Sequence, residues 1–151
     1  MTLSGNVNQG RETVSEAQTA TRRPATHAGV IPYTTVSNAR EAAALYQKAL
    51  GAELRDQRTM GDDQRLIHCE MIINGGAFMI CDPFPEHGHG ETGAGSCTLH
   101  LIVDDVQAWW DRAIAAGFTP AIEPHDAFWG DRYAQMKDAY GLTWALVGPR
   151  Q

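Results

Sequence analysis

The sequence is poor in basic residues and contains no long hydrophobic segment. Lys and Arg number 12 against 18 Asp and Glu, which gives a formal net charge of -6. Because nucleic-acid binding depends on a Lys/Arg surface that neutralises phosphates, this balance argues against a nucleic-acid partner. No apolar segment approaches the ~20 residues that span a bilayer, and the first residues lack the apolar core of a signal peptide. We therefore expect a cytoplasmic protein with no membrane partner.

Cysteine is also scarce, and its pattern argues against a disulfide framework. Cys69, Cys81 and Cys97 are odd in number and form no CxxC motif, so we expect buried thiols of a reducing compartment. The GxSxG and P-loop patterns are missing as well, which removes the usual signatures of hydrolases and phosphotransferases. With 43% hydrophobic and 20% charged residues over 151 positions, the composition suits one globular domain.

The first 28 residues differ from the rest of the chain. They are rich in Ser, Thr, Asn, Gln, Ala and Arg and show no hydrophobic periodicity. Such composition cannot bury enough apolar surface to form a packed element. We expect residues 1–28 to form a flexible arm, with docking on a partner subunit as the alternative, and residues 29–151 to form a single domain.

Two amphipathic helices with matching ends reveal an internal repeat. In SNAREAAALYQKALG, Asn38 is the expected N-cap, Glu41 follows three residues later, and Gly51 supplies a left-handed stop. In DDVQAWWDRAIAAG, we expect Asp104 to be the N-cap and Gly117 the stop. Gly51 and Gly117 lie 66 residues apart, which is the first measure of the repeat.

The strands around these helices repeat at the same spacing. A hydrophobic strand precedes each helix, another strand follows it, and a hairpin completes each half. The strands before the helices span residues 29–36 and 96–103, those after them span 52–60 and 118–123, and the hairpins turn at Asn74-Gly75 and near residues 139–141. Each half thus has the order β-α-β-β-β. Neither half could bury both faces of its sheet alone, so we expect both halves to curve around a shared concavity.

Four segments of the sequence resemble a known family. They are VIPYTTVSNAREAAALYQKALGAEL, LIHCEMIINGGAFMICD, CTLHLIVDDVQAW and FWGDRYAQMKDAYGLTWAL. Together, over residues 29–148, they are similar to the PhnB-like branch of the glyoxalase/bleomycin-resistance/dioxygenase (vicinal-oxygen-chelate) superfamily. The resemblance implies an α+β fold of two βαβββ modules that form an open barrel-like cavity, commonly in a homodimer. We expect module 1 at 29–82, a linker at 83–95 and module 2 at 96–148.

The resemblance also implies where a metal ion would bind. Metal-using members hold a divalent ion with one residue early in each module's first strand and one in its last strand. Transferred by position, these sites are Ile31, Thr98, Met79 (or Ile80) and Ala145. Ile, Met and Ala offer no hard donor, and a lone Thr is a poor ligand. We therefore expect no metal and no cofactor.

Strand alternation predicts which side chains face the cavity. Tyr33 and His100 occupy equivalent positions in the two first strands. Pairing Ile73 with Gly76 in the first hairpin places His68 and Glu70 on the face of Met79. Pairing Asp138 with Gly141 in the second hairpin places Arg132 on the face of Ala145. A one-residue slip would invert each face. The expected polar side chains of the cavity are Tyr33, His68, Glu70, His100 and Arg132.

These polar side chains have more than one interpretation. His68, Glu70 and His100 could act as an acid/base set, form a relocated metal site, or serve as hydrogen-bonded groups that orient a ligand. Arg132 could clamp a carboxylate or phosphate, or it could pair with Asp131 or Asp138.

Aromatic residues and a histidine pair complete the candidate list. Phe128 and Trp129 lie in a loop, where they could line the mouth of the pocket or pack over the barrel end or at a dimer interface. His87 and His89 in the linker are expected to be solvated, with a weak metal site as the alternative. In the second helix we expect Trp109 in the core and Trp110 at a contact between modules or subunits.

Two functions from different classes remain open. The first is a metal-independent protein that sequesters or carries a small organic molecule in its cavity. The second is a lyase, isomerase or dioxygenase-type enzyme that uses His68, Glu70 and His100 with or without a divalent metal. The predicted ligand-binding residues are Tyr33, His68, Glu70, His100, Phe128, Trp129 and Arg132. Fold alone does not decide between the two functions.

Overall fold

The computed structural model describes residues 27–88, 90 and 97–151. Most of the expected arm, residues 1–26, lies outside these ranges, as do residues 89 and 91–95 of the expected linker and residue 96 of the expected module 2. The described part has the predicted β-α-β-β-β order twice. Module 1 comprises β1 (Tyr33–Thr35), α1 (Ala39–Leu50), β2 (Glu53–Thr59), β3 (Leu66–Ile73) and β4 (Gly76–Cys81). Module 2 comprises β5 (Thr98–Ile102), α2 (Val106–Ala115), β6 (Thr119–Asp126), β7 (Arg132–Lys137) and β8 (Thr143–Gly148).

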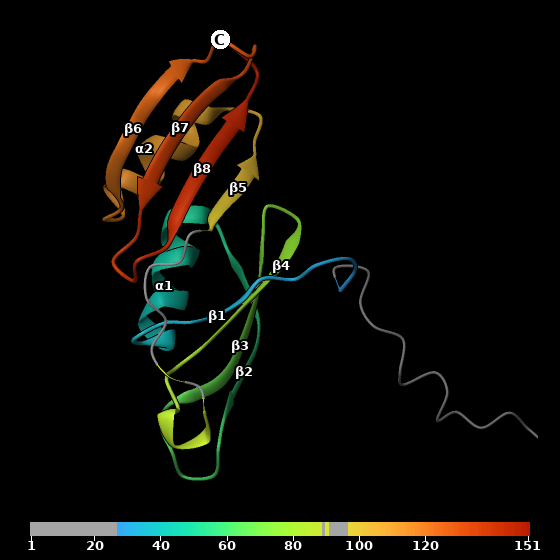
Figure 1. Ribbon diagram of the computed structural model, residues 1–151, viewed down its shortest axis with the longest axis vertical. Helices are drawn as coiled ribbons and strands as arrows, with labels where there is room; N and C mark the ends of the chain where they lie inside the picture. The colour runs from blue at the N-terminus through green and yellow to red at the C-terminus, as the bar shows by residue number, and fades with distance from the viewer. Residues whose placement is uncertain (1–26, 89, 91–96) are drawn as a thin grey trace, which may run out of the picture.

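Each module is one four-stranded mixed sheet with a helix on one face (Figure 1). The strand orders are β1-β4-β3-β2 and β5-β8-β7-β6. The outer pairs β1/β4 and β5/β8 are parallel, whereas the other neighbours are antiparallel. This arrangement confirms the predicted α+β class with two βαβββ modules. A short 3-10 helix, η2 (Pro85–His87), begins the connection between them.

The ends of α1 are as predicted. The Asn38 side chain accepts a hydrogen bond from the Glu41 amide, and Gly51 adopts a left-handed conformation with φ 64°. Its buried face consists of Ala39, Ala42, Ala43, Tyr46, Ala49 and Leu50. Small residues along this stripe allow α1 to approach the sheet closely, and the aromatic side chain of Tyr46 fills the space between modules.

The start of α2 differs by one residue from the prediction. Asp105, not Asp104, is the N-cap, and its side chain accepts from the Ala108 amide. The reason is that the parallel ladder with β8 continues through Val103, whose amide donates a 2.8 Å hydrogen bond to the Val147 carbonyl, so the chain needs one more residue before it can turn. The expected roles of the tryptophans are also reversed. Trp110 is buried in the core, whereas Trp109 is partly exposed with the Arg112 guanidinium 4.5 Å from its ring.

The first hairpin has the predicted register. Ile73 pairs with Gly76, and the two turn residues between them, Asn74 and Gly75, have positive φ angles of 50° and 81°. A two-residue turn of this kind matches the right-handed twist of the strands that it joins. Glu70 therefore pairs with Met79, on the face that the sequence predicted.

The second hairpin has a register one residue away from the prediction. Lys137 pairs with Thr143, so Asp138 lies opposite Leu142 instead of Gly141. The Asp138 carboxylate causes this longer turn, because Oδ1 accepts hydrogen bonds from the amides of Tyr140 and Leu142 at 2.8 and 2.9 Å. The slip inverts the faces of β7, since side chains alternate along a strand.

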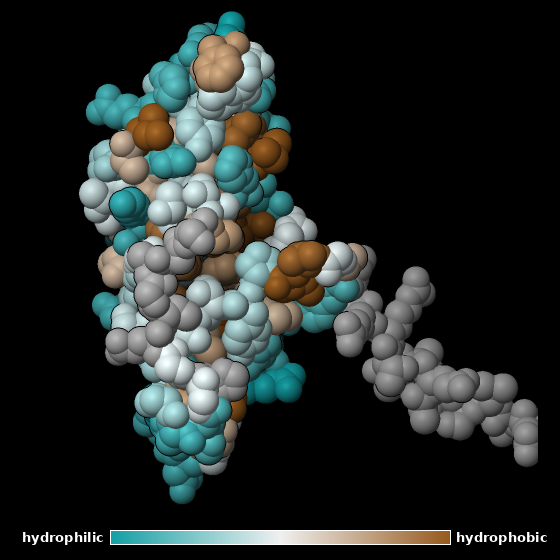
Figure 2. All heavy atoms as spheres, viewed as in Figure 1, coloured by the Kyte–Doolittle hydropathy of each residue, from teal (hydrophilic) through white to brown (hydrophobic). Residues whose placement is uncertain are grey.

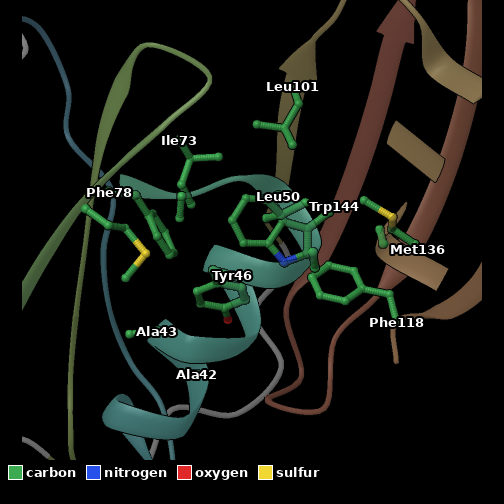
Figure 3. Close-up of a cluster of buried hydrophobic side chains, with 14 of the residues drawn as sticks. Ala42, Ala43, Tyr46, Leu50, Ile73, Phe78, Leu101, Phe118, Met136 and Trp144 are labelled. Carbon is green, nitrogen blue, oxygen red and sulfur yellow. The ribbon is translucent and has the colours of Figure 1, made fainter. Parts of the chain in front are cut away.

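The two modules share a core of aromatic side chains. Tyr46 from α1 and Phe78 from β4 meet Phe118 and Trp144 from module 2, and Figure 3 shows these rings turned toward one another. The Tyr46 and Trp144 ring centroids are 5.4 Å apart, as are those of Phe78 and Trp144. Aromatic pairs at such distances add to the apolar area that they bury, so this cluster holds the modules together beside the contact between α1 and α2.

The face of each sheet that lies opposite its helix is called here the open face. The two sheets lie end to end along the long axis of the molecule, with α2 behind the sheet of module 2 (Figure 1). Core residues such as Met71 and Leu146 point to the helices, so their strand neighbours Glu70 and Ala145 belong to the open faces. Neither α1 nor α2 has the length and hydrophobicity that crossing a bilayer would require.

Candidate functional site

The open face of module 1 brings three of the predicted residues together. In the strand register, Tyr33 pairs with Met79, and Met79 pairs with Glu70. His68, two residues before Glu70 on β3, shares this face. The rings of Tyr33 and His68 are stacked, with centroids 5.8 Å apart and an angle of 30° between their planes. The first hairpin and the parallel strand β1 thus place an acid, an imidazole and a phenol on one face.

Glu70 is the buried centre of this group. The residue is 8% exposed, and its Oε1 lies 2.6 Å from Nε2 of His27. Its second oxygen, Oε2, lies 4.0 Å from Nε2 of His68. His27 belongs to the segment that the sequence assigned to a flexible arm. A single histidine in a polar, aperiodic segment carries no signal of such a contact, and sequence reasoning missed it.

Tyr33 is fixed by the backbone of β3. Its hydroxyl donates a 2.8 Å hydrogen bond to the carbonyl of Ile67. Burial, followed by the nearby thiols of Cys81 and Cys69, raises the pKa of Tyr33 to about 12. The hydrogen bond to Ile67 holds the ring against His68.

The open face of module 2 carries His100 among residues that the sequence did not select. His100 pairs with Ala145, and Ala145 pairs with Gln135. The His100 and Tyr133 rings have centroids 6.3 Å apart, and Gln135 donates a 2.7 Å hydrogen bond to the Tyr133 hydroxyl. Within the described residues, His100 makes no hydrogen bond or ring contact with His68 or Glu70. The expected grouping of His68, Glu70 and His100 in one chain is therefore absent from the described part.

Arg132 lies on the opposite face from the one predicted. The shifted register of β7 turns it away from Ala145, and it contacts Asp126 Oδ1 on the neighbouring strand β6 at 3.3 Å and Gln107 Oε1 on α2 at 3.5 Å. Its ion-pair partner in the described part of the chain is thus Asp126, not the expected Asp131 or Asp138. Tyr133 and Gln135 take its place on the open face, and a correct register would have identified both.

Phe128 and Trp129 extend the open face of module 2 with exposed rings. Phe128 is 96% exposed and Trp129 is 50% exposed. Their ring centroids are 5.1 Å apart, and Trp129 lies 5.3 Å from Tyr133. We use the name aromatic row for the connected rings of Phe128, Trp129, Tyr133, His125 and His100.

A hollow of about 330 Å³ lies where the two modules meet. In Figure 2, brown hydrophobic side chains lie at the middle of this face and also on its module 2 half. The side chains of Thr98 and His100 are its polar groups. The complete lining is Ala28, Val30, Ile31, Pro32, Ile73, Gly76, Ala77, Phe78, Thr98, Leu99, His100, Leu101 and Trp144. An apolar hollow with few polar groups is the usual composition of a small-molecule pocket.

The positions that hold a metal in related folds do not fit one here. Ile31 and Thr98 line the hollow, while Met79 and Ala145 sit on the two sheets. A divalent ion needs about three or four N, O or S ligands, and these four side chains supply one hydroxyl. Within residues 27–88, 90 and 97–151, no group of three or more His, Cys, Asp or Glu is placed to hold a metal ion. His87 of the linker is exposed beside Phe84, and His89 lies outside the described residues.

Comparisons with known proteins agree with this architecture. Residues 26–146 match the family model of the Glyoxalase/Bleomycin resistance protein/Dioxygenase superfamily. Uncharacterized protein Mb0911c of Mycobacterium bovis is 36% identical over 124 residues, which cover 78% of this chain and 81% of that protein. Protein PA1353 of Pseudomonas aeruginosa has a similar structure, with a TM-score of 0.68 at 23% identity over 82% of this chain and 99% of that chain. A PhnB protein from Bacillus cereus aligns with a TM-score of 0.62 at 16% identity, over 80% and 98% of the two chains. The two structural similarities show the shared fold.

Proposed function

The chain belongs to the glyoxalase/bleomycin resistance/dioxygenase superfamily, and we propose that it binds a small organic molecule without a metal ion, to sequester or carry it. The hollow between the modules is the observation that carries this proposal. Its volume of about 330 Å³ falls within the range of about 300–1,000 Å³ that ligand pockets occupy. The similarity to a PhnB protein supports placing the chain in the PhnB-like branch.

The lining of the hollow supports binding rather than metal-dependent chemistry. Ile31 and Thr98 stand where metal-using relatives carry ligands, and the remaining wall consists mainly of Ala, Val, Leu, Phe and Trp side chains. Apolar walls stabilise a ligand by removing its surface from water, at about 25 cal/mol per Å². His100, at the edge of the hollow, can orient the ligand through one hydrogen bond.

We further propose that two copies pair through their open faces. The open face of module 2 exposes apolar and aromatic side chains, including Ile102 at 67% and Phe128 at 96% exposure. Contiguous exposed apolar surface favours a protein contact. In a symmetric dimer, the open face of module 1 in one copy can meet the open face of module 2 in the other copy. Such pairing would enclose Glu70 and the aromatic row in a common pocket.

A second candidate function rests on Glu70 and its neighbours. A buried carboxylate 2.6 Å from one imidazole and 4.0 Å from another is suited to proton transfer, which requires groups within hydrogen-bond reach of the substrate. Metal-free acid/base catalysis by Glu70 and His68 would therefore be a lyase or isomerase activity. Turnover of a bound compound that the Glu70→Gln variant binds but does not convert would favour this enzyme over the binding protein.

A thermal-shift screen tests the proposed binding function. Metabolites and antibiotics are added to metal-free protein, to the His100→Ala variant, and to a His87→Ala control whose exposed histidine lies in the linker. Ligand binding stabilises the folded state by about 2.7 kcal/mol at a hundred times the dissociation constant. We expect at least one compound to raise the melting temperature of the native and His87→Ala proteins more than that of His100→Ala. The proposal is wrong if no compound distinguishes His100→Ala from the other two.

A further inference from the structure

Glu70 is a buried carboxylate whose polar side-chain partners, among the described residues, are two histidines: His27 and His68. In the strand register Glu70 pairs with Asp56 on β2, and His68 pairs with Arg58. Arg58 donates a 2.6 Å hydrogen bond to Asp56, so its charge is directed to that carboxylate. A buried carboxylate is costly unless a donor or a positive charge compensates it.

His27 fills this need from outside the sheet. It lies six residues before β1, and its Nε2 reaches Glu70 Oε1 at 2.6 Å. The residues that follow it are open to solvent. Gly29 has a positive φ of 66°, a Cβ added there would meet no atom within 4 Å, and Val30 is 96% exposed. A contact held by one side chain on an exposed segment can be replaced without disturbing the core.

We propose that the ligand carries a cationic group, an ammonium or a guanidinium, which binds Glu70 in place of His27. This inference rests on the proposed binding function and names the chemical class of its ligand: Glu70 does not line the hollow, but Ala28, the chain neighbour of His27, does, so the cationic group would extend from the hollow to Glu70. Glu70 supplies the charge, because hydrogen bonds between ionised partners are stronger than neutral ones. The stacked rings of Tyr33 and His68 on the same face supply a flat apolar surface beside the charge. His27 occupies the position of the ligand's cationic group when no ligand is bound.

The experiment compares three probes that share a phenyl ring: 2-phenylethylamine, 2-phenylethanol and 3-phenylpropanoate. Each is titrated by calorimetry and by amide NMR into the full chain near neutral pH. A charge-assisted bond to Glu70 should make the amine bind about tenfold more tightly than the alcohol. The carboxylate should bind most weakly, because it would face Glu70.

Variants identify the residue responsible. In Glu70→Gln, the amine should lose its advantage and bind like the alcohol. In His27→Ala, the competing imidazole is gone, so the affinity for the amine should rise several-fold while that for the alcohol stays the same. The His87→Ala control should match the native chain. Circular dichroism establishes that Glu70→Gln is folded; should that variant unfold, the different responses of amine and alcohol in His27→Ala still decide the question.

Three results would overturn the inference. The first is equal binding of amine and alcohol by the native chain. The second is a preference for the amine that survives in Glu70→Gln. The third is weaker binding of the amine by His27→Ala, which would make His27 a part of the binding site. Tight binding of Zn²⁺, added as zinc chloride without any organic probe, by His27, His68 and Glu70 would also overturn the inference. If the alcohol binds at the hollow and the amine gains nothing, the binding function stands and this inference fails. If no probe and no screened compound binds, both fail.

Discussion

The hydroxyl of Tyr46 donates a 2.7 Å hydrogen bond to Oδ2 of Asp138, and this bond joins a helix of module 1 to a turn of module 2. The same oxygen accepts from the indole nitrogen of Trp144 at 2.9 Å. Oδ1 accepts from two turn amides, those of Tyr140 and Leu142. Burial and the nearby Asp138 carboxylate raise the pKa of Tyr46 far above its ordinary value. One carboxylate therefore links the modules and sets the turn length that aims Tyr133 at the open face.

Replacement of Asp138 by Asn should destabilise the fold. The amide group removes the charge and one acceptor from a site with four donors, and hydrogen bonds to a charged group contribute about 1.5–3 kcal/mol each. We expect Asp138→Asn to lower the free energy of unfolding by about 2 kcal/mol in urea titrations. Tyr140→Phe is the control, because it keeps the backbone amide that Asp138 accepts from. Equal stability of Asp138→Asn and the control would show that the carboxylate does not have this structural role.

Gly148 should not tolerate a side chain. A Cβ at this position would collide with the backbone carbonyl oxygen of Val103 and lie 3.1 Å from Cγ2 of Val106. Forcing an extra methyl into a packed site costs about 1–3 kcal/mol, and we expect Gly148→Ala to lose stability in this range. Gly76→Ala is the matched control, since its nearest neighbour would be 3.7 Å away. Thermal unfolding should give a lower melting temperature for Gly148→Ala than for Gly76→Ala. Equal melting temperatures would mean that β8 lies farther from Val103 and from α2.

Tyr33 should contribute to the loss of stability at high pH. Burial raises its pKa from 10.0 to about 12. A group whose pKa is higher in the folded state stabilises that state below the unfolded pKa, and this contribution is lost as the pH rises through the folded pKa. We therefore expect the free energy of unfolding to fall between about pH 10 and 12, and to fall less steeply in Tyr33→Phe. Identical alkaline profiles for both proteins would contradict the raised pKa of the phenol.

The dimer proposal predicts a concentration-dependent mass that depends on the aromatic row. Sedimentation velocity should show a dimer for the native chain and a larger monomer fraction for Trp129→Ser, because exposed aromatic side chains contribute strongly to protein contacts. Leu54→Ser serves as the control, since Leu54 is a partly exposed apolar residue that pairs with the core residue Met71 and lies away from the open faces. A native chain that remains monomeric at every concentration would rule the dimer out.

The sequence predicts the fold well because its signals are local and repeated. The Asn38 cap, the Gly51 stop and the Asn74-Gly75 turn each act within a few residues, and the structure confirms all three. The resulting register of β3 and β4 also placed His68 and Glu70 on the face of Met79 correctly. These predictions required no information about distant parts of the chain.

The errors have both local and distant causes. The second hairpin was assigned a two-residue turn, whereas Asp138 accepts from amides two and four residues ahead and is held by Tyr46 of the other module, which produces the slip that moved Arg132. His27 reaches Glu70 across 43 positions of sequence. The separation of His100 from His68 depends on how the modules pack, which strand alternation alone does not determine.

Ligand binding by protein that has been stripped of metal tests the central claim most directly. The tightest compound from the screen is titrated into uniformly ¹⁵N-labelled protein with EDTA present, and then into the same protein supplied with zinc and manganese. The account predicts saturable binding with the same dissociation constant in both samples, and chemical-shift changes at the amides of Ile31, Ala77 and Thr98 around the hollow. Binding that appears only after a divalent ion is added, or shift changes that leave these three amides untouched, would contradict it.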